Sequence, residues 1–228
     1  IINQMVVEGA LLKAGSTAGS SYVLPKNSGY IYETIKYRFK RAALEEHKVF
    51  NEIKDKHSFL RNLKENVSSV LFYAFTEMLN NAIEHSNSQY VEIEMVIDSK
   101  NLTFIISDFG IGVFRNVMKK RNLHSEIEAM QDLLKGKTTT QPHSHTGEGI
   151  FFTSKIADIF ELDSFGYKMR IDNIIQDVFF QERQRIKKGT KVSFSIGINS
   201  NKHLSDIFNK YVSIPGEAGF DKTEILVR

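Results

Sequence analysis

A long helical stretch at residues 62–86 is the feature that most constrains the fold, because it contains neither glycine nor proline. Its apolar residues recur at the spacing of one helix face, at Val67, Val70, Leu71, Ala74, Met78 and Ile83. Two runs rich in β-forming residues follow directly, at 90–97 and 102–107, with a turn between them at 98–101. This order predicts a helix followed by a β-hairpin, so we expect an α/β protein.

The rest of the main part of the chain alternates between helical and β patterns. One or two helices are expected within 31–60, and further helices at 113–135, 149–160 and 203–211. Strands are expected at Glu161–Phe165, Lys168–Ile171, Asp177–Gln181 and Lys191–Ile198. The segment 136–146 has no periodicity, which is typical of a loop.

The two ends of the sequence have a different character. Two short apolar runs, Ala10–Leu12 and Tyr22–Leu24, flank a tip rich in Gly, Ser and Thr, which predicts a hairpin. It is similar to the wing of a winged-helix domain, although an ordinary surface hairpin fits as well. Residues 25–30 indicate a linker, and the last residues, GFDKTEILVR, look like the first strand of a further unit. Because the chain begins with Ile1 rather than Met, we expect a fragment of a longer protein.

Composition excludes several classes of protein. Of the 228 residues, 41% are hydrophobic and 25% are charged, which are ordinary values for a globular domain. No apolar run reaches the roughly 18 residues that a membrane span needs, and no signal-peptide pattern is visible. The absence of cysteine excludes disulfides, thiolate metal sites and thiol catalysis and fits a cytoplasmic location. The net charge of +3 does not by itself indicate nucleic-acid binding.

The first cluster of candidate functional residues lies near the end of the long helix, in the sequence EMLNNAIEH. Glu77, Asn81 and His85 are spaced i, i+4 and i+8, so they share one helix face. A carboxylate can orient or deprotonate a nucleophile, and an amide oxygen is a suitable ligand for Mg²⁺. A solvated polar helix face explains the same spacing, so the cluster alone does not decide between the two interpretations.

Two glycine-containing clusters follow the hairpin. Asp108-Phe-Gly110-Ile111-Gly112 comes directly after the strand at 102–107, where glycines let a ligand approach the backbone. Thr146-Gly147-Glu148-Gly149-Ile150 begins an apolar helix, and free amide groups at a helix N-terminus bind anions such as phosphate. Each pattern also occurs in ordinary turns. Gly189-Thr190, before the strand at 191–198, is a minor third signal.

Three other patterns are weaker. GKTTT at 136–140 lacks the earlier glycine of a P-loop, because position 131 is Gln131 and no strand precedes it. His143 and His145 lie in an aperiodic segment without a third ligand nearby, which disfavours a zinc site. The basic run RQRIKK at 183–188 is typical of a solvated hairpin, although contact with DNA or an acidic partner would also fit.

Taken in order, these motifs resemble those of the GHKL (Bergerat-fold) ATPases, which include gyrase B, MutL, heat-shock chaperone ATPases, histidine kinases and anti-sigma-factor serine kinases. The resemblance covers about residues 45–200. It implies a two-layer α/β sandwich with one mixed, mostly antiparallel sheet and helices on one face. It also implies that ATP and Mg²⁺ bind between the Glu77 helix and a lid at 113–146.

The resemblance assigns a role to each motif residue. Asn81 matches the Mg²⁺ ligand and Glu77 the catalytic base, whereas the role of His85 stays open between packing and ligand contact. Asp108 would accept a hydrogen bond from the adenine amine, with help from Thr190. The backbone at Gly110, Ile111 and Gly112 would pass close to the nucleotide. The segment Thr146, Gly147, Glu148, Gly149 and Ile150 would hold the phosphates, and Lys137 with His145 would approach the terminal phosphate from the lid.

The resemblance favours one branch of this superfamily. Histidine kinases usually have Asn where this sequence has Glu77, and neither His47-Lys nor His57-Ser fits a phosphoacceptor motif. EMLNNAIEHS and GEGIFFTSKIAD look closer to the anti-sigma-factor kinases, which phosphorylate Ser or Thr of a partner. Winged helix, ATPase and STAS-like domains in that order form a bacterial regulator that this chain resembles. The implied division is a wing remnant at 1–24, linker or helix at 25–45, the ATP-binding domain at 46–212 and a further unit at 213–228.

Two functions of different class follow from the resemblance. The chain is either an enzyme, as an ATPase or a Ser/Thr protein kinase, or a nucleotide-gated regulatory module without significant catalysis. The implied partners are ATP, a protein, DNA through the missing winged helix, and a second copy of the chain.

Overall fold

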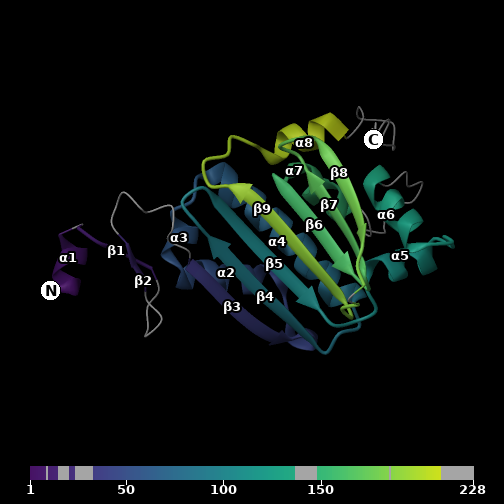
Figure 1. The fold of residues 1–228 in the computed structure, drawn as a ribbon, viewed down its shortest axis with the longest axis horizontal. Helices are drawn as coiled ribbons and strands as arrows, with labels where there is room; N and C mark the ends of the chain where they lie inside the picture. The colour runs from purple at the N-terminus through teal and green to yellow at the C-terminus, as the bar shows by residue number, and fades with distance from the viewer. Residues whose placement is uncertain (9, 15–20, 24–32, 137–147, 185, 212–228) are drawn as a thin grey trace.

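The computed structural model describes residues 1–8, 10–14, 21–23, 33–136, 148–184 and 186–211. Its main feature is a seven-stranded sheet in the order β3-β4-β5-β9-β6-β7-β8 (Figure 1). The strands are β3 (Glu33–Lys40), β4 (Tyr90–Ile97), β5 (Asn101–Asp108), β6 (Ile159–Ser164), β7 (Tyr167–Asp172), β8 (Asp177–Glu182) and β9 (Thr190–Gly197). All neighbouring pairs of these described strands are antiparallel.

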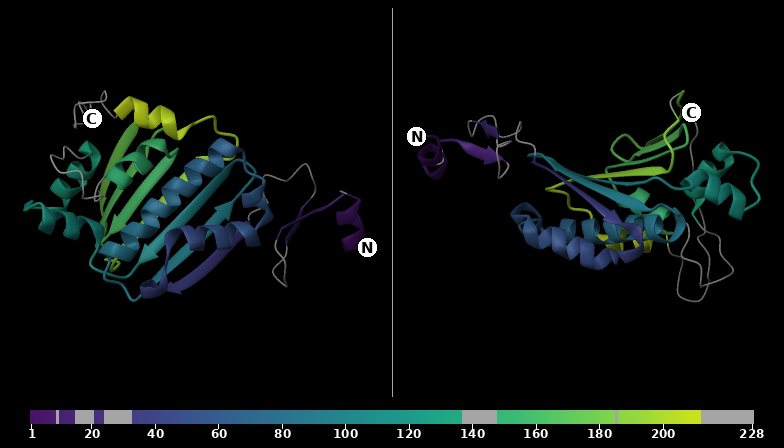
Figure 2. Two further views of the ribbon diagram at one scale, coloured as in Figure 1. Left: turned by 180° about the vertical axis from the view of Figure 1, so that it is seen from behind. Right: turned by 90° about the horizontal axis from the view of Figure 1, so that it is seen from below.

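Helices cover one face of this sheet, as the views from behind and from below show (Figure 2). They are α2 (Glu46–Lys56), α3 (Ser58–Arg61), α4 (Glu65–His85), α7 (Glu148–Ile156) and α8 (Leu204–Tyr211). The helix α4 packs on β5 and β9, with α2 and α7 beside it, and α8 packs on α7. The two-layer α/β sandwich implied by the resemblance is therefore confirmed.

The core lies between the two layers. In β4 and β5 buried and partly exposed residues alternate along the strand, because successive side chains of a strand point to opposite faces. The central contact is the stack of Phe104 on Phe194, 5.0 Å apart between β5 and β9, and Phe75 of α4 packs edge-on against Phe104. These three fully buried rings join α4 to the middle of the sheet.

The prediction of helices over residues 31–60 is wrong for its first part. Residues 33–40 form the edge strand β3, whose register pairs Lys40 with Tyr90 and Glu33 with Ile97 of β4. The apolar residues Ile35, Tyr37 and Phe39 alternate with charged ones and pack against the core. The apolar residues recur with period 2, as in a strand, but the many charged residues between them obscure this pattern in the sequence. The short helix η2 (Arg41–Ala43), α2 and α3 follow.

The predicted helix at 149–160 ends early, and Ile159 already begins β6. Two side chains satisfy the last carbonyl groups of α7 and so end the helix. The amide nitrogen of Asn173 donates to the carbonyl oxygens of Ser154 and Ala157, at 2.7 and 2.8 Å. Lys202 donates to the carbonyl of Ala157 at 2.7 Å and forms an ion pair with Asp158.

The helical prediction for 113–135 corresponds to two helices, α5 (Val113–Lys120) and α6 (Glu126–Lys135). The Ser125 hydroxyl accepts a hydrogen bond from the amide of Glu128 and so caps α6, a role for which serine is favoured. Arg121 and Asp132 form an ion pair between the two helices.

The N-terminal part forms α1 (Ile2–Val7) and a small two-stranded sheet of β1 (Leu12–Ala14) and β2 (Ser21–Val23). The predicted hairpin is therefore present, with strand positions shifted by one or two residues. None of the helices among the described residues combines the length and hydropathy that a membrane span requires.

Candidate functional site

The C-terminal half of α4 carries the first group of predicted site residues. Glu77, Asn81 and His85 are all partly exposed, while Met78, Leu79 and Ala82 between them are buried in the core. The polar stripe therefore lies at the edge of the core rather than on the outer helix surface. From Glu77 to His85 at the end of α4 the rise is about 12 Å, at 1.5 Å per residue, so the stripe suits an elongated ligand.

Glu77 lies at the N-terminus of α7. A Cβ atom added at Gly149 would come within 2.0 Å of Glu77 Oε2, so only glycine fits at this position without displacing the carboxylate. The positive end of a helix dipole favours a negative charge there. Gly149 and Ile150 are both buried, and the structure thus joins the first and third sequence motifs, more than 60 residues apart, at one place.

The side chains of Asn81 and His85 follow along the same face. Among the residues that the structure describes, the Asn81 amide makes no hydrogen bond, although most amides of this kind find a partner when buried. Burial lowers the pKa of His85, and the positive charge of Lys120 on α5 lowers it further. The imidazole of His85 is therefore mainly neutral at pH 7 and does not add positive charge to the site.

Asp108 ends β5 and is buried, with 6% of its surface exposed. Its Oδ1 atom accepts hydrogen bonds from the amide of Gly110 at 2.9 Å and from the amide of Thr190 at 3.2 Å. Burial raises the pKa of Asp108, and the hydrogen bonds from Gly110 and Thr190 counter part of that rise. Within the described part of the chain Asp108 has no ion pair, so its charge is balanced only by backbone and hydroxyl dipoles.

Thr190, the first residue of β9, lies beside Asp108 because β5 and β9 are neighbours in the sheet. Its hydroxyl oxygen accepts a hydrogen bond from the amide of Val113, 2.9 Å away, at the start of α5. The Thr190 side chain thus links the end of the sheet to the beginning of the predicted lid.

The turn after α4 holds the motif on that helix against the glycine-containing motif that begins at Asp108. Ser86 O accepts a hydrogen bond from the amide of Ile111 at 2.8 Å, and a Cβ atom at Gly110 would lie only 1.6 Å from the same oxygen. The Ser88 hydroxyl accepts from the amide of Phe109 at 3.1 Å. Gly110 is therefore required by a close backbone approach, which explains the first glycine of the DxGxG motif.

The remaining residues of that motif lead into α5. Gly112 precedes the helix as its N-cap with φ +83°, a conformation that side chains rarely adopt. The side chain of Ile111 is 41% exposed, which is unusual for isoleucine. Ile111 is therefore an exposed apolar residue three positions after Asp108 in the chain.

Some predicted residues cannot be placed. Lys137, Thr146 and Gly147, together with His143 and His145, lie outside the described residues. Glu148 is the first residue of α7, but its side chain is not described. The predicted lid is thus described over α5 and α6 only, and the predicted phosphate loop only from Glu148 onward.

Arg41 and the serines at 86 and 88 also shape this region, although they were not among the predicted site residues. The Arg41 guanidinium donates to the carbonyl oxygens of Ile83 and Ser88, both at 2.6 Å, at the end of α4. Nothing in the sequence connects Arg41 with a helix that ends more than 40 positions later. By contrast, the Ser-Asn-Ser sequence at 86–88 was a usable signal, because such residues favour turns and bond to the local backbone.

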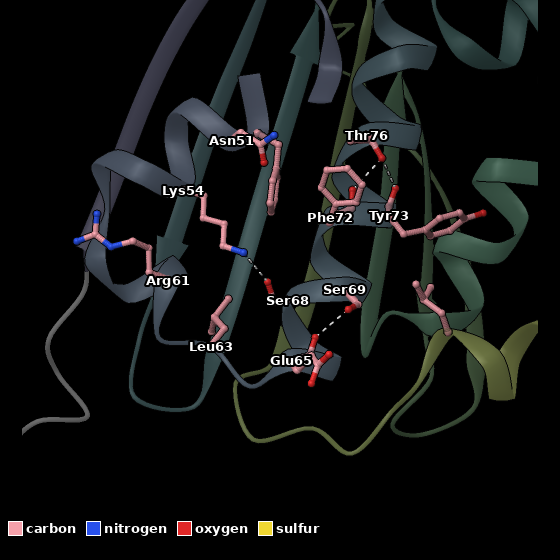
Figure 3. Close-up of a pocket in the computed structure, with 12 residues that line it drawn as sticks. Asn51, Lys54, Arg61, Leu63, Glu65, Ser68, Ser69, Phe72, Tyr73 and Thr76 are labelled. Atoms are coloured by element: carbon pink, nitrogen blue, oxygen red, sulfur yellow. Dashed lines mark hydrogen bonds between the residues drawn. The ribbon is translucent and has the colours of Figure 1, made fainter. Parts of the chain in front are cut away.

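A groove on the outer helix surface is separate from this site. A groove of about 610 Å³ lies on the outer side of α2, α3 and α4 (Figure 3) and contains none of the predicted site residues. Lys54 donates to the Ser68 hydroxyl across it at 3.2 Å, and the ring of Phe72 is 40% exposed there. Among the described residues, no group of three or more acidic or histidine side chains could hold a metal ion by itself.

Comparison with known families now adds to this geometry. The family described as "Histidine kinase-like ATPase domain" matches residues 49–171, more than half of the chain. The chain belongs to the histidine kinase-like ATPase family. The GHKL identification from the sequence is thereby confirmed, and the matched region of this ATPase domain contains Glu77, Asn81, Asp108 and Gly149 but not Thr190.

One curated relative gives independent support. The DNA mismatch repair protein MLH3 of Saccharomyces cerevisiae is 29% identical over 90 residues, which are 38% of this chain and 12% of that protein. The similarity therefore concerns one segment of a much longer protein. Both comparisons agree on a GHKL-type ATPase domain.

Proposed function

We propose that this ATPase domain binds Mg·ATP along the C-terminal half of α4 and transfers its terminal phosphoryl group, to water or to a Ser or Thr of a partner protein. One observation carries the proposal. The buried Asp108 carboxylate is held by Gly110 and Thr190 at the end of the stripe that begins at Glu77. A buried acceptor at one end and a helix N-terminus at the other suit a ligand with an amine-bearing ring and a phosphate chain.

The Asp108 end would bind the adenine. A remaining lone pair of the Asp108 carboxylate accepts a hydrogen bond from an exocyclic amine of the base, and Thr190 keeps that carboxylate in place. Ile111, exposed three positions later in the chain, supplies an apolar surface for a planar ring. A Cβ atom would collide with Ser86 O at Gly110 and with the Phe165 ring at Gly112, so these two glycines keep the turn after β5 in place beside the proposed adenine site.

The Glu77 end would act on the phosphates. Mg·ATP supplies the reactive phosphoryl group with part of its charge neutralised. The Asn81 amide, which has no hydrogen-bond partner among the described residues, is suited to be a Mg²⁺ ligand, since Mg²⁺ in proteins needs few side chains when phosphates and waters complete its shell. Glu77 would orient the attacking hydroxyl, and the amide groups at Gly149 and its neighbours would hold the phosphates.

The first test is binding. We expect isothermal titration to show heat with ATP and with a non-hydrolysable analogue, both stronger with Mg²⁺. Asp108→Ala should weaken binding by roughly 10- to 100-fold, since a hydrogen bond to a charged group contributes about 1.5–3 kcal/mol. Asp55→Ala, at an exposed aspartate of α2, is the matched control and should bind as wild type does. Equal affinities of the two variants would contradict the proposed adenine site.

The second test separates catalysis from binding. Glu77→Gln should keep ATP affinity within a few-fold but lower the single-turnover rate by about 100-fold or more, the scale of general-base catalysis. Glu65→Gln, at an exposed glutamate in the first turn of the same helix, is the control. If wild type and Glu77→Gln are equally inert while ATP alters binding of a partner, the domain acts as a nucleotide-gated module instead.

The wider setting of the domain is part of the same proposal. The chain would come from a bacterial, cytoplasmic regulator of the anti-sigma-factor type. In it residues 1–24 belong to a DNA-binding winged helix, 25–32 to a connection, 33–212 to the ATPase domain, whose sheet includes β3, and 213–228 to a STAS-like domain. The sequence patterns at the two ends support this, and transfer of labelled phosphate from ATP to a Ser or Thr of an added partner would support the kinase branch.

A further inference from the structure

The two edges of the seven-stranded sheet differ in chemistry (Figure 1). The edge strand β3 is charged, and its Lys36 and Arg38 form ion pairs with Glu94 and Glu92 of β4, at 3.3 and 3.8 Å. The opposite edge strand, β8, exposes Phe179 by 45% and Phe180 by 37%. Proteins usually protect a free edge with charges or proline, and the centre of β8 has neither.

The backbone of β8 is available for pairing. The amide of Arg183 donates to Gly166 O at 2.6 Å, directly after the register pair Tyr167–Glu182. Because hydrogen-bonded positions alternate along an antiparallel pair, Phe179 and Gln181 bond to β7. The N–H and C=O groups of Phe180 and the C=O group of Val178 therefore point away from β7, toward an edge that no described strand pairs with, whereas the Val178 amide donates to Asp177 Oδ1 at 2.9 Å.

The sequence of β8 is self-complementary about Phe179. Val178 and Phe180 flank it as apolar neighbours, and Asp177 and Gln181 follow as polar ones. If an identical strand lies antiparallel to β8 with Phe179 on the two-fold axis, apolar residues face apolar residues and polar residues face polar ones. Within β8 this register places no two like charges opposite each other. Such like-charge pairs would destabilise the interface.

Exposed isoleucines beyond the strand fit the same arrangement. Ile174 and Ile175 lie before β8 and are 69% and 62% exposed, and Ile186 lies after it and is 67% exposed. Antiparallel pairing brings the start of one β8 beside the end of the other. In the register centred on Phe179, Ile174 and Ile175 lie opposite positions 184 and 183 of the other copy, two and three positions before its Ile186, so part of this exposed apolar surface would be lost, which favours association.

We propose that β8 is a dimerisation edge at which two copies of this chain pair antiparallel and continue the sheet from one subunit into the other. Val178 pairs with Phe180 of the partner subunit, and each such pair exchanges both backbone hydrogen bonds once the Val178 amide has left Asp177 Oδ1. Phe179 contacts Phe179 of the partner subunit on the face of the sheet that the helices leave uncovered. A closed two-fold contact of this kind uses the same patch on both subunits, so it produces a dimer and no longer assembly. This inference is independent of the nucleotide site.

Oligomeric state tests the proposal. Size-exclusion chromatography with light scattering on the full chain should give twice the 26.1 kDa of one subunit. Phe179→Lys places like charges on the axis and should give a monomer with unchanged circular dichroism. Phe72→Lys is the matched control, because Phe72 of α4 is similarly exposed, at 40%, and points into the groove of Figure 3. It should remain dimeric.

A cross-link locates the interface directly. The chain has no cysteine, so the variant Phe179→Cys has a single thiol, which should form an intersubunit disulfide under mild oxidation. Phe72→Cys should not cross-link. Three outcomes would each overturn the proposal: a monomeric wild-type chain, equal cross-linking of the two variants, or a dimer that survives Phe179→Lys. A monomer would indicate that β8 pairs with a different strand or with none.

Discussion

Asp108 shows at the scale of one residue how a proposed binding residue can oppose stability. A carboxylate that is buried without an ion pair is unfavourable, and burial raises its pKa above the ordinary 3.8. The backbone amides of Gly110 and Thr190 offset only part of that cost. A residue in this position is best explained by a ligand that needs the acceptor.

The pH dependence of Asp108 has a definite sign. Because its pKa is raised in the folded state, the folded protein binds this proton more tightly than the unfolded chain does. Its contribution is stabilising below about pH 3.8 and is lost as the pH rises through the raised pKa. We expect the free energy of unfolding of wild type, relative to Asp108→Asn, to decrease as pH rises from about 4 to 7, when measured by denaturant unfolding at each pH. A difference that is constant or increases would contradict the raised pKa.

Gly149 permits a prediction that separates geometry from charge. In Gly149→Ala the new Cβ would overlap Glu77 Oε2, so the carboxylate must move while its charge remains. We expect single-turnover hydrolysis to fall by about 100-fold, since a displacement of about 1 Å can have that effect, with a smaller change in ATP affinity. Ser154→Ala, farther along the same helix, is the control. Unchanged turnover in Gly149→Ala would show that the position of Glu77 does not matter.

At the scale of elements, Arg41 connects the edge of the sheet to the site. Its two hydrogen bonds hold the end of α4, next to the turn that contacts Gly110. We expect Arg41→Ala to lower the free energy of unfolding by about 1–3 kcal/mol, because one carbonyl in the last turn of α4 and one in the turn after it lose a charged donor, and to weaken ATP binding as well.

Arg38→Ala is the matched control for that change. Its ion pair with Glu92 is long, at 3.8 Å, and both side chains are exposed. Pairs of this kind contribute less than about 1 kcal/mol, so denaturant unfolding should barely change. Similar losses in the two variants would show that the cap at the end of α4 is not important.

Elements with a clear period could be predicted from the sequence, and those whose period is masked could not. The helix at 62–86 and the hairpin after it follow from spacing alone, and α4 and β4–β5 confirm them. The strand β3 was missed because its outer face is almost wholly charged. The end of α7 was missed because Asn173 and Lys202, which satisfy its carbonyls, come from distant parts of the chain.

The candidate site shows the same difference between local sequence patterns, which could be predicted, and tertiary contacts, which could not. Asp108, Gly110 and Glu77 could be named from motifs, since each motif has a local pattern. Their proximity was implied only by the family resemblance and not by the motifs themselves, because it arises from tertiary contacts such as Ser86 with Gly110 and Glu77 with Gly149. The roles of Asn81 as a magnesium ligand and Thr190 as an adenine contact remain predictions.

At the scale of the whole molecule, the order of the strands in the sheet differs from their order in the sequence. The strand β9 comes last among the strands, yet it lies in the centre of the sheet, between β5 and β6. It provides Phe194 to the central stack and Thr190 to the site. The family match ends at residue 171, so it includes neither of these contributions.

The central place of β9 has a consequence for biosynthesis. A chain leaving the ribosome has β5 and β6 ready long before β9 emerges, and until then each presents an unpaired edge of apolar residues. Such late, non-local pairing is slow and exposes intermediates to aggregation. Release of the newly made polypeptide before residue 197 would leave the sheet in two unconnected halves, so a truncated transcript of this gene should yield insoluble product and not merely a less stable domain.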